Sequence, residues 1–113
     1  MTNLSSRKCT PCQVGAHTLK YSKIQEFVKQ VPTWKTVEEY GVWKLHKDYE
    51  FEDFAQAMKF VNKVADVAEA EGHHPNIWVH DWNKLRLELY THKIKGLHEN
   101  DFILATKIDK LKT

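Results

Sequence analysis

Three histidines and two carboxylates are spaced so that they could move protons. Glu69 comes shortly before the adjacent pair His73 and His74, and His92 and Asp101 follow later in the chain. Histidine is the side chain whose ordinary pKa lies nearest neutrality, so a group of them favours general acid–base chemistry. If the three rings line one cleft, the carboxylate of Asp101 is expected to orient His92 or to stabilise its positive charge.

A zinc site is the main chemical alternative for the same three histidines. Zinc accepts imidazole nitrogens as ligands, so His73, His74 and His92 could form part of such a site. Two adjacent histidines are poor chelators of one ion, however, because both rings rarely reach the same point. Pro75 stiffens the loop and could hold the two rings in different orientations. A histidine pair that is merely exposed and inert is the third possibility, and the pattern alone leaves all three open.

Composition indicates one soluble globular domain. The chain has 113 residues and 13.3 kDa, with 42% hydrophobic and 28% charged residues. This length is too short for two independent cores, and the hydrophobic fraction is too high for a disordered chain. No apolar stretch is long enough to cross a bilayer. The net charge of +2 is too balanced to favour nucleic-acid binding. We expect a cytoplasmic protein, although an organelle stays possible.

A pair of cysteines lies near the start of the chain. Cys9 and Cys12 form a C-x-x-C motif, which occurs in zinc sites and in redox pairs. Neither a second such pair nor a strand followed by a helix surrounds it. We therefore expect residues 1–18 to be an N-terminal arm with reduced thiols, and residues 19–113 to be the single domain.

Hydrophobic periodicity predicts three helices and four strands. Apolar residues recur at helical spacing or alternate with polar ones in a regular order along the chain. The expected order is helix 22–31, strands 34–37 and 42–46, helix 52–71, strands 77–82 and 84–92, and helix 99–111. This α-β-β-α-β-β-α order predicts an α+β fold in which helices cover one face of a four-stranded antiparallel sheet.

The long central helix has the clearest pattern. Its predicted buried stripe consists of apolar residues three or four positions apart, and Gly72 stands where a helix commonly ends. The stripe comprises Phe51, Phe54, Met58, Val61, Ala65 and Ala68. Several aromatic side chains remain for the other sheet face, so we expect a partner there. These are Trp43, Trp78, Trp82 and Tyr90.

The spacing of the candidate residues resembles the signature of the pterin-4a-carbinolamine dehydratases. Glu69 is followed after three residues by His73-His74-Pro75, then after six residues by Trp82. Nine further residues lead to His92 and eight more to Asp101. The resemblance covers residues 19–111, and every signature position is filled at an allowed spacing. The family's antiparallel four-stranded sheet with helices on one side agrees with the predicted order.

The resemblance implies the dehydration of 4a-hydroxytetrahydrobiopterin to quinonoid dihydropterin and water, a step in tetrahydrobiopterin recycling. It implies that His73 and His92 are the acid–base pair and that His74 orients the pterin and shares in proton transfer. Glu69 would accept hydrogen bonds from the amino-pyrimidine edge. The implied substrate-binding set is Glu69, His74, Pro75, Trp82 and Asp101. No metal and no redox cofactor is required.

Several of these roles stay open. Trp82 could form a wall of the pocket or belong to the sheet core, and Asp101 could also cap the last helix. Other family members imply two further functions, a dimerisation cofactor for a homeodomain transcription factor and an enzyme of molybdenum-cofactor metabolism that acts on another pterin. The family also implies a homodimer or homotetramer, while the balanced charge and the short apolar stretches predict no direct contact with nucleic acid or membrane. Nothing in their spacing gives a role to His46, His80 or His98.

Overall fold

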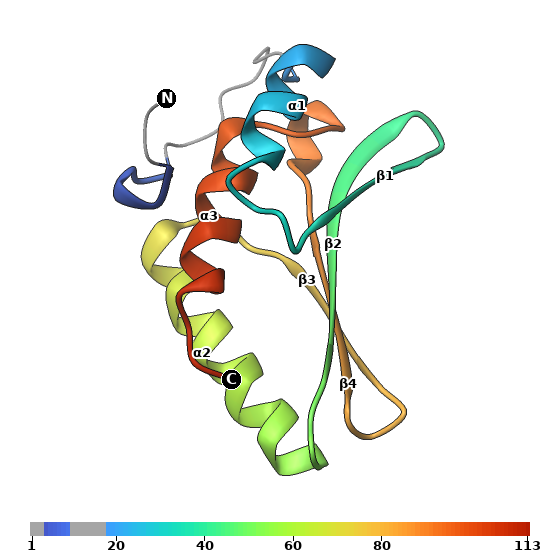
Figure 1. Ribbon diagram of the computed structural model, residues 1–113, viewed down its shortest axis with the longest axis vertical. Helices are drawn as coiled ribbons and strands as arrows, with labels where there is room; N and C mark the ends of the chain where they lie inside the picture. The colour runs from blue at the N-terminus through green and yellow to red at the C-terminus, as the bar shows by residue number, and fades with distance from the viewer. Residues whose placement is uncertain (1–3, 10–17) are drawn as a thin grey trace.

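Three α-helices and four strands follow one another in the predicted order. The computed structural model describes residues 4–9 and 18–113, and Figure 1 shows α2 and α3 side by side against the sheet. The elements are η1 Leu4–Ser6, α1 Tyr21–Val28, β1 Lys35–Glu39, β2 Val42–Glu50, α2 Phe54–Glu71, β3 Asn76–His80, β4 Lys84–Leu89, η2 His92–Ile94 and α3 Glu99–Asp109. No helix in the described ranges is long and apolar enough to cross a membrane.

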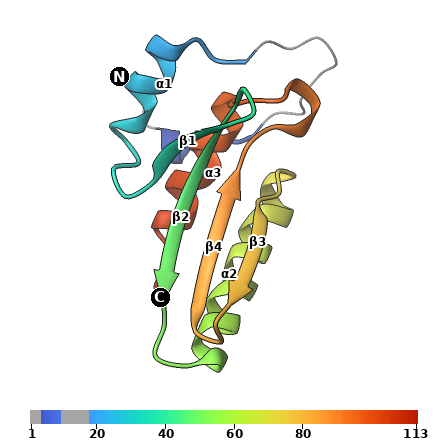
Figure 2. The ribbon, with the colours of Figure 1, turned by 90° about the vertical axis from the view of Figure 1, so that its right-hand side faces the viewer.

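The four strands form one antiparallel sheet in the order β1-β2-β4-β3. In Figure 2 the strands lie in front of α2 and α3, so both helices cover the same face. The predicted α+β fold, with helices packed on one side of a four-stranded antiparallel sheet, is therefore confirmed.

Side chains alternate between the two faces of the sheet as the period-two pattern predicts. Leu85, Leu87 and Leu89 of β4 and Leu45 of β2 are fully buried in the core beneath the helices. The residues that alternate with these leucines lie on the other face, which we call the open face. They include His46 and Asp48 of β2 and Arg86 and Glu88 of β4. This alternation gives β4 one wall of leucines and one wall of polar and charged groups.

The central helix has the predicted period but buries a different stripe. The side chains of α2 that are fully buried are Ala57, Phe60, Val64 and Ala68. Phe54, which the predicted stripe includes, is 54% exposed. Apolar residues cover a wide arc of this helix, so its sequence does not reveal which line of them faces the sheet. Phe60 packs against Tyr49 of β2, with ring centroids 4.8 Å apart.

Both ends of α2 are well defined. The Asp53 side chain accepts a hydrogen bond from the Gln56 N–H at 2.8 Å and caps the start. Gly72 ends the helix at φ +66°, a left-handed conformation that costs glycine little. The His73 N–H then donates to the Ala68 carbonyl at 3.3 Å. This cap fixes the direction in which the chain leaves the helix.

The β3–β4 hairpin turns at Asp81 and Trp82, both of which have positive φ. Asn83 comes directly before β4, and its side chain donates to the Phe51 carbonyl at 2.9 Å. Strand β4 ends earlier than the sequence pattern suggests, because Thr91 forms a bridge with Gly96. This bridge closes a small loop that contains η2.

The described part of the N-terminal segment packs on the domain. Leu4 is fully buried in the core, and the Cys9 N–H donates to the Glu71 carboxylate at 2.9 Å. Burial, together with the nearby charge of Glu71, raises the pKa of the Cys9 thiol to about 12. Cys12 lies outside the described residues, so the C-x-x-C hypothesis stays a prediction.

Candidate active site

A cavity of about 440 Å³ opens where the end of α2, the end of β4 and the start of α3 meet. Its volume falls in the range of about 300–1,000 Å³ that is usual for small-molecule sites. All three candidate histidines, His73, His74 and His92, line it, as does Pro75. The arrangement expected from the sequence, three imidazoles around one cavity, is therefore present in the fold.

His73 is held by a buried carboxylate. Its Nε2 lies 2.6 Å from Oδ1 of Asp101, which has no exposed surface. The other carboxylate oxygen accepts hydrogen bonds from the Thr91 hydroxyl and the His98 N–H, both at 2.9 Å. Because a carboxylate accepts hydrogen bonds, the neutral His73 ring carries its proton on Nε2 and leaves Nδ1 as an acceptor.

The expectation that Asp101 orients His92 is wrong. Among the described residues its side chain binds His73, Thr91 and His98 instead. The expectation that Asp101 helps to cap α3 is confirmed, but from another position: His98 is the N-cap and accepts from the Asn100 N–H, and Asp101 is the third residue of the helix. Asp101 accepts from the His98 N–H and so completes a capping box from inside the helix, and it is not part of the cavity lining.

His74 pairs with the other expected carboxylate. Its Nε2 lies 2.6 Å from Oε1 of Glu69, one turn back on α2. This pair is open to solvent, since 77% of the Glu69 side chain is exposed. Glu69 does not itself line the cavity. In the structure the carboxylate is thus a partner of His74.

His92 has an aromatic neighbour. Its ring stacks on Tyr90, with centroids 4.2 Å apart. The Lys44 ammonium lies 4.6 Å from the centroid of the Tyr90 ring, a distance suited to a cation–π contact. The two histidines expected to act as acid and base therefore have different surroundings, a buried carboxylate for His73 and a half-buried aromatic ring for His92.

Trp82 lies far from the cavity along the hairpin. It occupies the turn after β3, at the end of the strand opposite to Asn76, and it is 62% exposed. The core position expected for Trp82 is wrong, and the pocket lining does not include it. The turn explains this outcome, because a residue at a hairpin tip has no opposing layer to pack against.

Besides Gly72, which ends α2, five cavity-lining residues are not among the candidate site residues of the sequence. They are Asn76, Tyr90, Thr91, Lys93 and Asn100. Each lies one or two positions from a predicted site residue, so proximity in the sequence is the signal that could have found them. Their side chains carry hydroxyl, amide and ammonium groups, and the lining contains no carboxylate.

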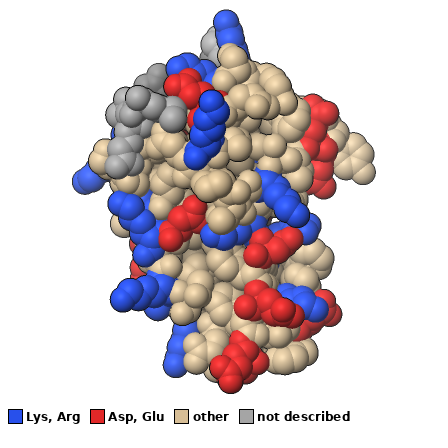
Figure 3. All heavy atoms as spheres, in the orientation of Figure 1, with Lys and Arg blue, Asp and Glu red and all other residues tan. Residues whose placement is uncertain are grey.

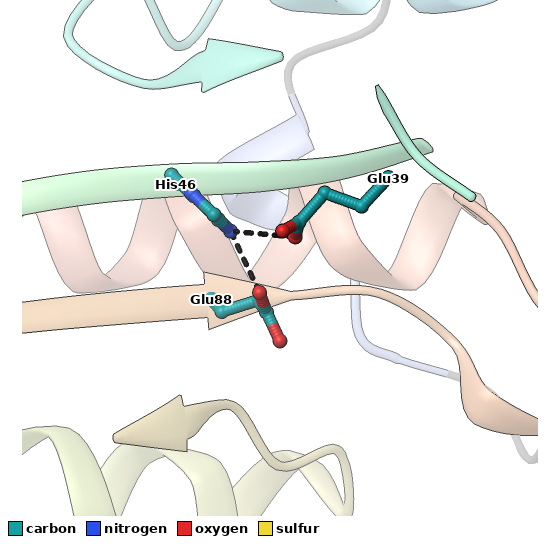
Figure 4. Close-up of side chains that lie close together, drawn as sticks. All are labelled: Glu39, His46 and Glu88. Carbon is teal, nitrogen blue, oxygen red and sulfur yellow. Dashed lines mark hydrogen bonds and ion pairs between the residues drawn. The ribbon is translucent and has the colours of Figure 1, made fainter. Parts of the chain in front are cut away.

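The geometry does not bring the three cavity histidines together as metal ligands. In the described part of the chain, one group of three possible ligand atoms lies within 4.8 Å, from Glu39, His46 and Glu88. Figure 4 shows these side chains pointing toward one another from β1, β2 and β4. The Lys44 ammonium lies 3.3 Å from Glu39 and 3.7 Å from Glu88, so a cation already balances these carboxylates.

A second cavity, of about 570 Å³, lies on the open face, and its lining includes His80 but none of His73, His74 and His92. Trp78, which is 58% exposed, and the ion pair between Arg86 and Asp48 form part of its lining. Figure 3 shows basic and acidic side chains mixed over the visible face of the molecule. That face offers no patch of a single charge sign that would favour a polyanion.

Comparisons with known proteins agree on one family. Residues 17–111 match the family model described as "Pterin 4 alpha carbinolamine dehydratase". A protein of Methylococcus capsulatus is 43% identical over 96% of this chain and 93% of its own length. One from Syntrophotalea carbinolica is 44% identical over 98% of both chains. Each carries the name "Putative pterin-4-alpha-carbinolamine dehydratase".

Solved structures show the same fold. A transcriptional coactivator/pterin dehydratase from Brucella melitensis superposes with a TM-score of 0.73 and 28% identity, over 82% of this chain and 96% of that one. A pterin dehydratase-like protein identified as a RuBisCO assembly factor in the alpha-carboxysome gives a TM-score of 0.56 at 24% identity, over 68% of this chain and 86% of that one. The second similarity concerns the fold alone.

Proposed function

Since the chain belongs to the pterin 4 alpha carbinolamine dehydratase family, we propose that its three-histidine cavity dehydrates 4a-hydroxytetrahydrobiopterin by acid–base catalysis. Membership in the family supports pterin-carbinolamine dehydratase activity in general. The particular substrate, its place in tetrahydrobiopterin recycling and the roles of the histidines are our proposal. The observation that carries it is the convergence of His73, His74 and His92 on one cavity.

The reaction requires two proton transfers and no change of oxidation state. The bond between the ring-junction carbon and its hydroxyl oxygen breaks, and the oxygen leaves with the electron pair. An acid supplies a proton to that oxygen, so the leaving group is water. A base removes the proton from the neighbouring ring nitrogen, and the freed electron pair forms the carbon–nitrogen double bond. Histidine serves in either role near neutral pH.

The surroundings of the two histidines suggest which ring does what. The buried Asp101 carboxylate would stabilise the positive charge that His73 gains when it accepts a proton, as the carboxylate does in a Ser-His-Asp triad. We therefore assign the base to His73 and the acid to His92. His74, held by Glu69, would orient the pterin at the cavity.

Substitution of the two histidines tests this proposal. His73→Ala and His92→Ala should each lower kcat by about 10²-fold or more, the usual contribution of a general acid or base. Both variants should keep the circular-dichroism spectrum of the wild type, since neither ring lies in the hydrophobic core. Turnover is measured with freshly generated hydroxytetrahydropterin, against the uncatalysed reaction.

His80→Ala is the matched control. His80 lies on β3 at the other end of the sheet and pairs with Asp81, so its loss should leave kcat unchanged. If the His73 and His92 variants also keep wild-type kcat, the histidine mechanism is wrong.

A role as a transcriptional coactivator is the second candidate, because the similar protein from Brucella melitensis is named for both functions. Coactivation by partner binding would survive His73→Ala and His92→Ala, whereas dehydration would not. An enzyme for another pterin, such as one of molybdenum-cofactor metabolism, would also need the histidines. Turnover measured on several hydroxylated pterins separates that case from 4a-hydroxytetrahydrobiopterin.

We also propose that the protein assembles as a homodimer or homotetramer. Trp78 and Trp82 expose large aromatic surfaces, and association of two copies would remove such surface from water. Light scattering after size exclusion should give a mass of two or four chains of 13.3 kDa. A single-chain mass at micromolar concentration would contradict this assembly.

A further inference from the structure

Asn76 is a cavity residue whose amide is held from one side. It is the first residue of β3 and lines the histidine cavity. Its Nδ2 donates to Oε1 of Glu88 on β4 at 2.9 Å, directly across the strand pair. A carboxylate accepts hydrogen bonds and donates none, so the nitrogen of the amide must face Glu88. The amide oxygen, Oδ1, is then left as an acceptor.

Glu88 is itself fixed on the open face. Its Oε2 lies 2.7 Å from Nε2 of His46, and Figure 4 shows the two side chains meeting between β2 and β4. Lys44 adds a positive charge 3.7 Å away. Burial alone would raise the pKa of the Glu88 carboxyl, but the hydrogen bonds from Asn76 and His46 outweigh it and lower the pKa. Glu88 therefore stays ionised and keeps its role as acceptor at neutral pH.

We propose that Asn76 recognises the amino-pyrimidine edge of the substrate through Oδ1, and that Glu88 is the positioning residue that fixes the Asn76 amide in this orientation. The inference rests on the proposed pterin substrate. Its amino group and ring N–H are adjacent donors, for which a fixed acceptor in the cavity lining is the complementary group.

This role replaces the one that the sequence suggests for Glu69. Glu69 lies outside the cavity lining and its Oε1 is bound to His74. Asn76 lies in the lining, and the contact with Glu88 occupies its donor side. The lining contains no carboxylate, so an amide oxygen is the side-chain acceptor best placed for a neutral N–H group there.

Steady-state kinetics and pterin binding together test the inference. Asn76→Ala should raise KM about 5- to 30-fold with kcat nearly unchanged, because the contact lies away from the reacting bond and acts equally on substrate and transition state. Glu88→Gln should raise KM less, since a glutamine can also donate and no longer forces one orientation. Asp48→Asn, another carboxylate-to-amide change on the open face, is the matched control and should leave KM unchanged.

Binding of oxidised pterin, followed by quenching of its fluorescence, separates this inference from the proposed reaction. Asn76→Ala should weaken the binding of pterin more than the binding of 2-dimethylaminopterin, which lacks the amino N–H donors. If the wild type binds pterin with this pattern but does not dehydrate the carbinolamine, the reaction fails and the recognition role stands. If Asn76→Ala keeps the wild-type KM and the wild-type preference for pterin, the recognition role is wrong. If the wild type neither binds nor turns over a pterin, both are wrong.

Discussion

A chain of hydrogen bonds connects the start of α3 to the candidate base. The Thr91 hydroxyl and the His98 N–H both donate to Asp101, and Asp101 in turn accepts from His73. All three contacts are on one carboxylate without exposed surface. A buried charge of this kind requires its donors, because it has no water to replace them. The same contacts therefore stabilise the fold and orient the His73 ring.

Asp101→Asn is expected to reduce both activity and stability. The NH₂ group of an asparagine is a hydrogen-bond donor and would face groups that themselves donate to Asp101. The free energy of unfolding should therefore fall by about 2–4 kcal/mol. Loss of the carboxylate also removes the charge that favours protonated His73, so kcat should fall at least 10-fold. Urea denaturation and steady-state kinetics measure the two effects.

Thr91→Val separates the two contributions of Asp101. It removes one donor and leaves the Asp101–His73 contact, so stability should fall by about 1 kcal/mol while kcat falls much less than in Asp101→Asn. Wild-type kcat in Asp101→Asn would show that the carboxylate has no part in the reaction.

The end of α2 determines the positions of His73 and His74. Gly72 adopts φ +66° and reverses the chain just before His73. No atom lies within 4 Å of the place where a Cβ would be added at this glycine. The cost of a substitution there is thus conformational and not steric.

Gly72→Ala should lower the free energy of unfolding by about 1–2 kcal/mol, the cost of a left-handed non-glycine residue. We expect kcat to fall as well, since relaxation of the cap would move His73 and His74. Gly41→Ala is the matched control, because Gly41 has φ +79° and equally free space in the β1–β2 turn. It should cost similar stability and leave kcat unchanged. Equal kcat in both variants would contradict a role of the cap in placing the histidines.

An ion pair holds α2 and α3 together near the cavity. Lys107 of α3 lies 2.7 Å from Glu71 of α2, which also accepts from the Cys9 N–H. Burial would raise the pKa of the Glu71 carboxyl, but the hydrogen bonds from Lys107 and Cys9 outweigh it and hold the pKa below its ordinary value of 4.5. A carboxyl with a lowered folded-state pKa stabilises the fold above its ordinary pKa. This contribution is lost as the pH falls through the folded-state pKa.

Glu71→Gln should therefore destabilise the protein in a pH-dependent way. At pH 7 the expected loss is about 1–3 kcal/mol of unfolding free energy, the range for hydrogen bonds to a charged group. As the pH falls below 4.5 the difference between wild type and variant should shrink, and it is lost once the pH is below the lowered folded-state pKa of Glu71, where both side chains are uncharged. Urea denaturation at pH 7 and at pH 3 measures this difference in unfolding free energy. A difference that is the same at both pH values would rule out the ion pair as the cause of the destabilisation.

Regular residue patterns predict most of the secondary structure, whereas the remaining side-chain positions depend on local geometry. The alternation in β4 and the apolar period of α2 depend on residue type alone, and together they predict the fold class. The sequence could not show that Phe54 is exposed, because the wide apolar arc of α2 permits more than one buried line. It also could not show that Asp101 binds His73 and not His92, since this depends on how α3 approaches the end of α2. Trp82 was misplaced because the turn begins one residue before it.

The cavity forms where elements distant in sequence meet. The end of α2, the end of β4 and the start of α3 each contribute lining residues, and the sheet behind them holds these elements in place. On the open face, the cluster of Glu39, His46 and Glu88 adjoins the cavity through Asn76. One end of the sheet therefore carries both groups, the cavity histidines on one side and a charged network on the other.

The most direct test is a single-turnover comparison on generated 4a-hydroxytetrahydrobiopterin. With purified wild-type protein, formation of the quinonoid dihydropterin should be far faster than without it, and a variant carrying both His73→Ala and His92→Ala should return the rate nearly to the uncatalysed value. Wild-type protein that leaves the uncatalysed rate unchanged, or a double variant as fast as wild type, would contradict the account.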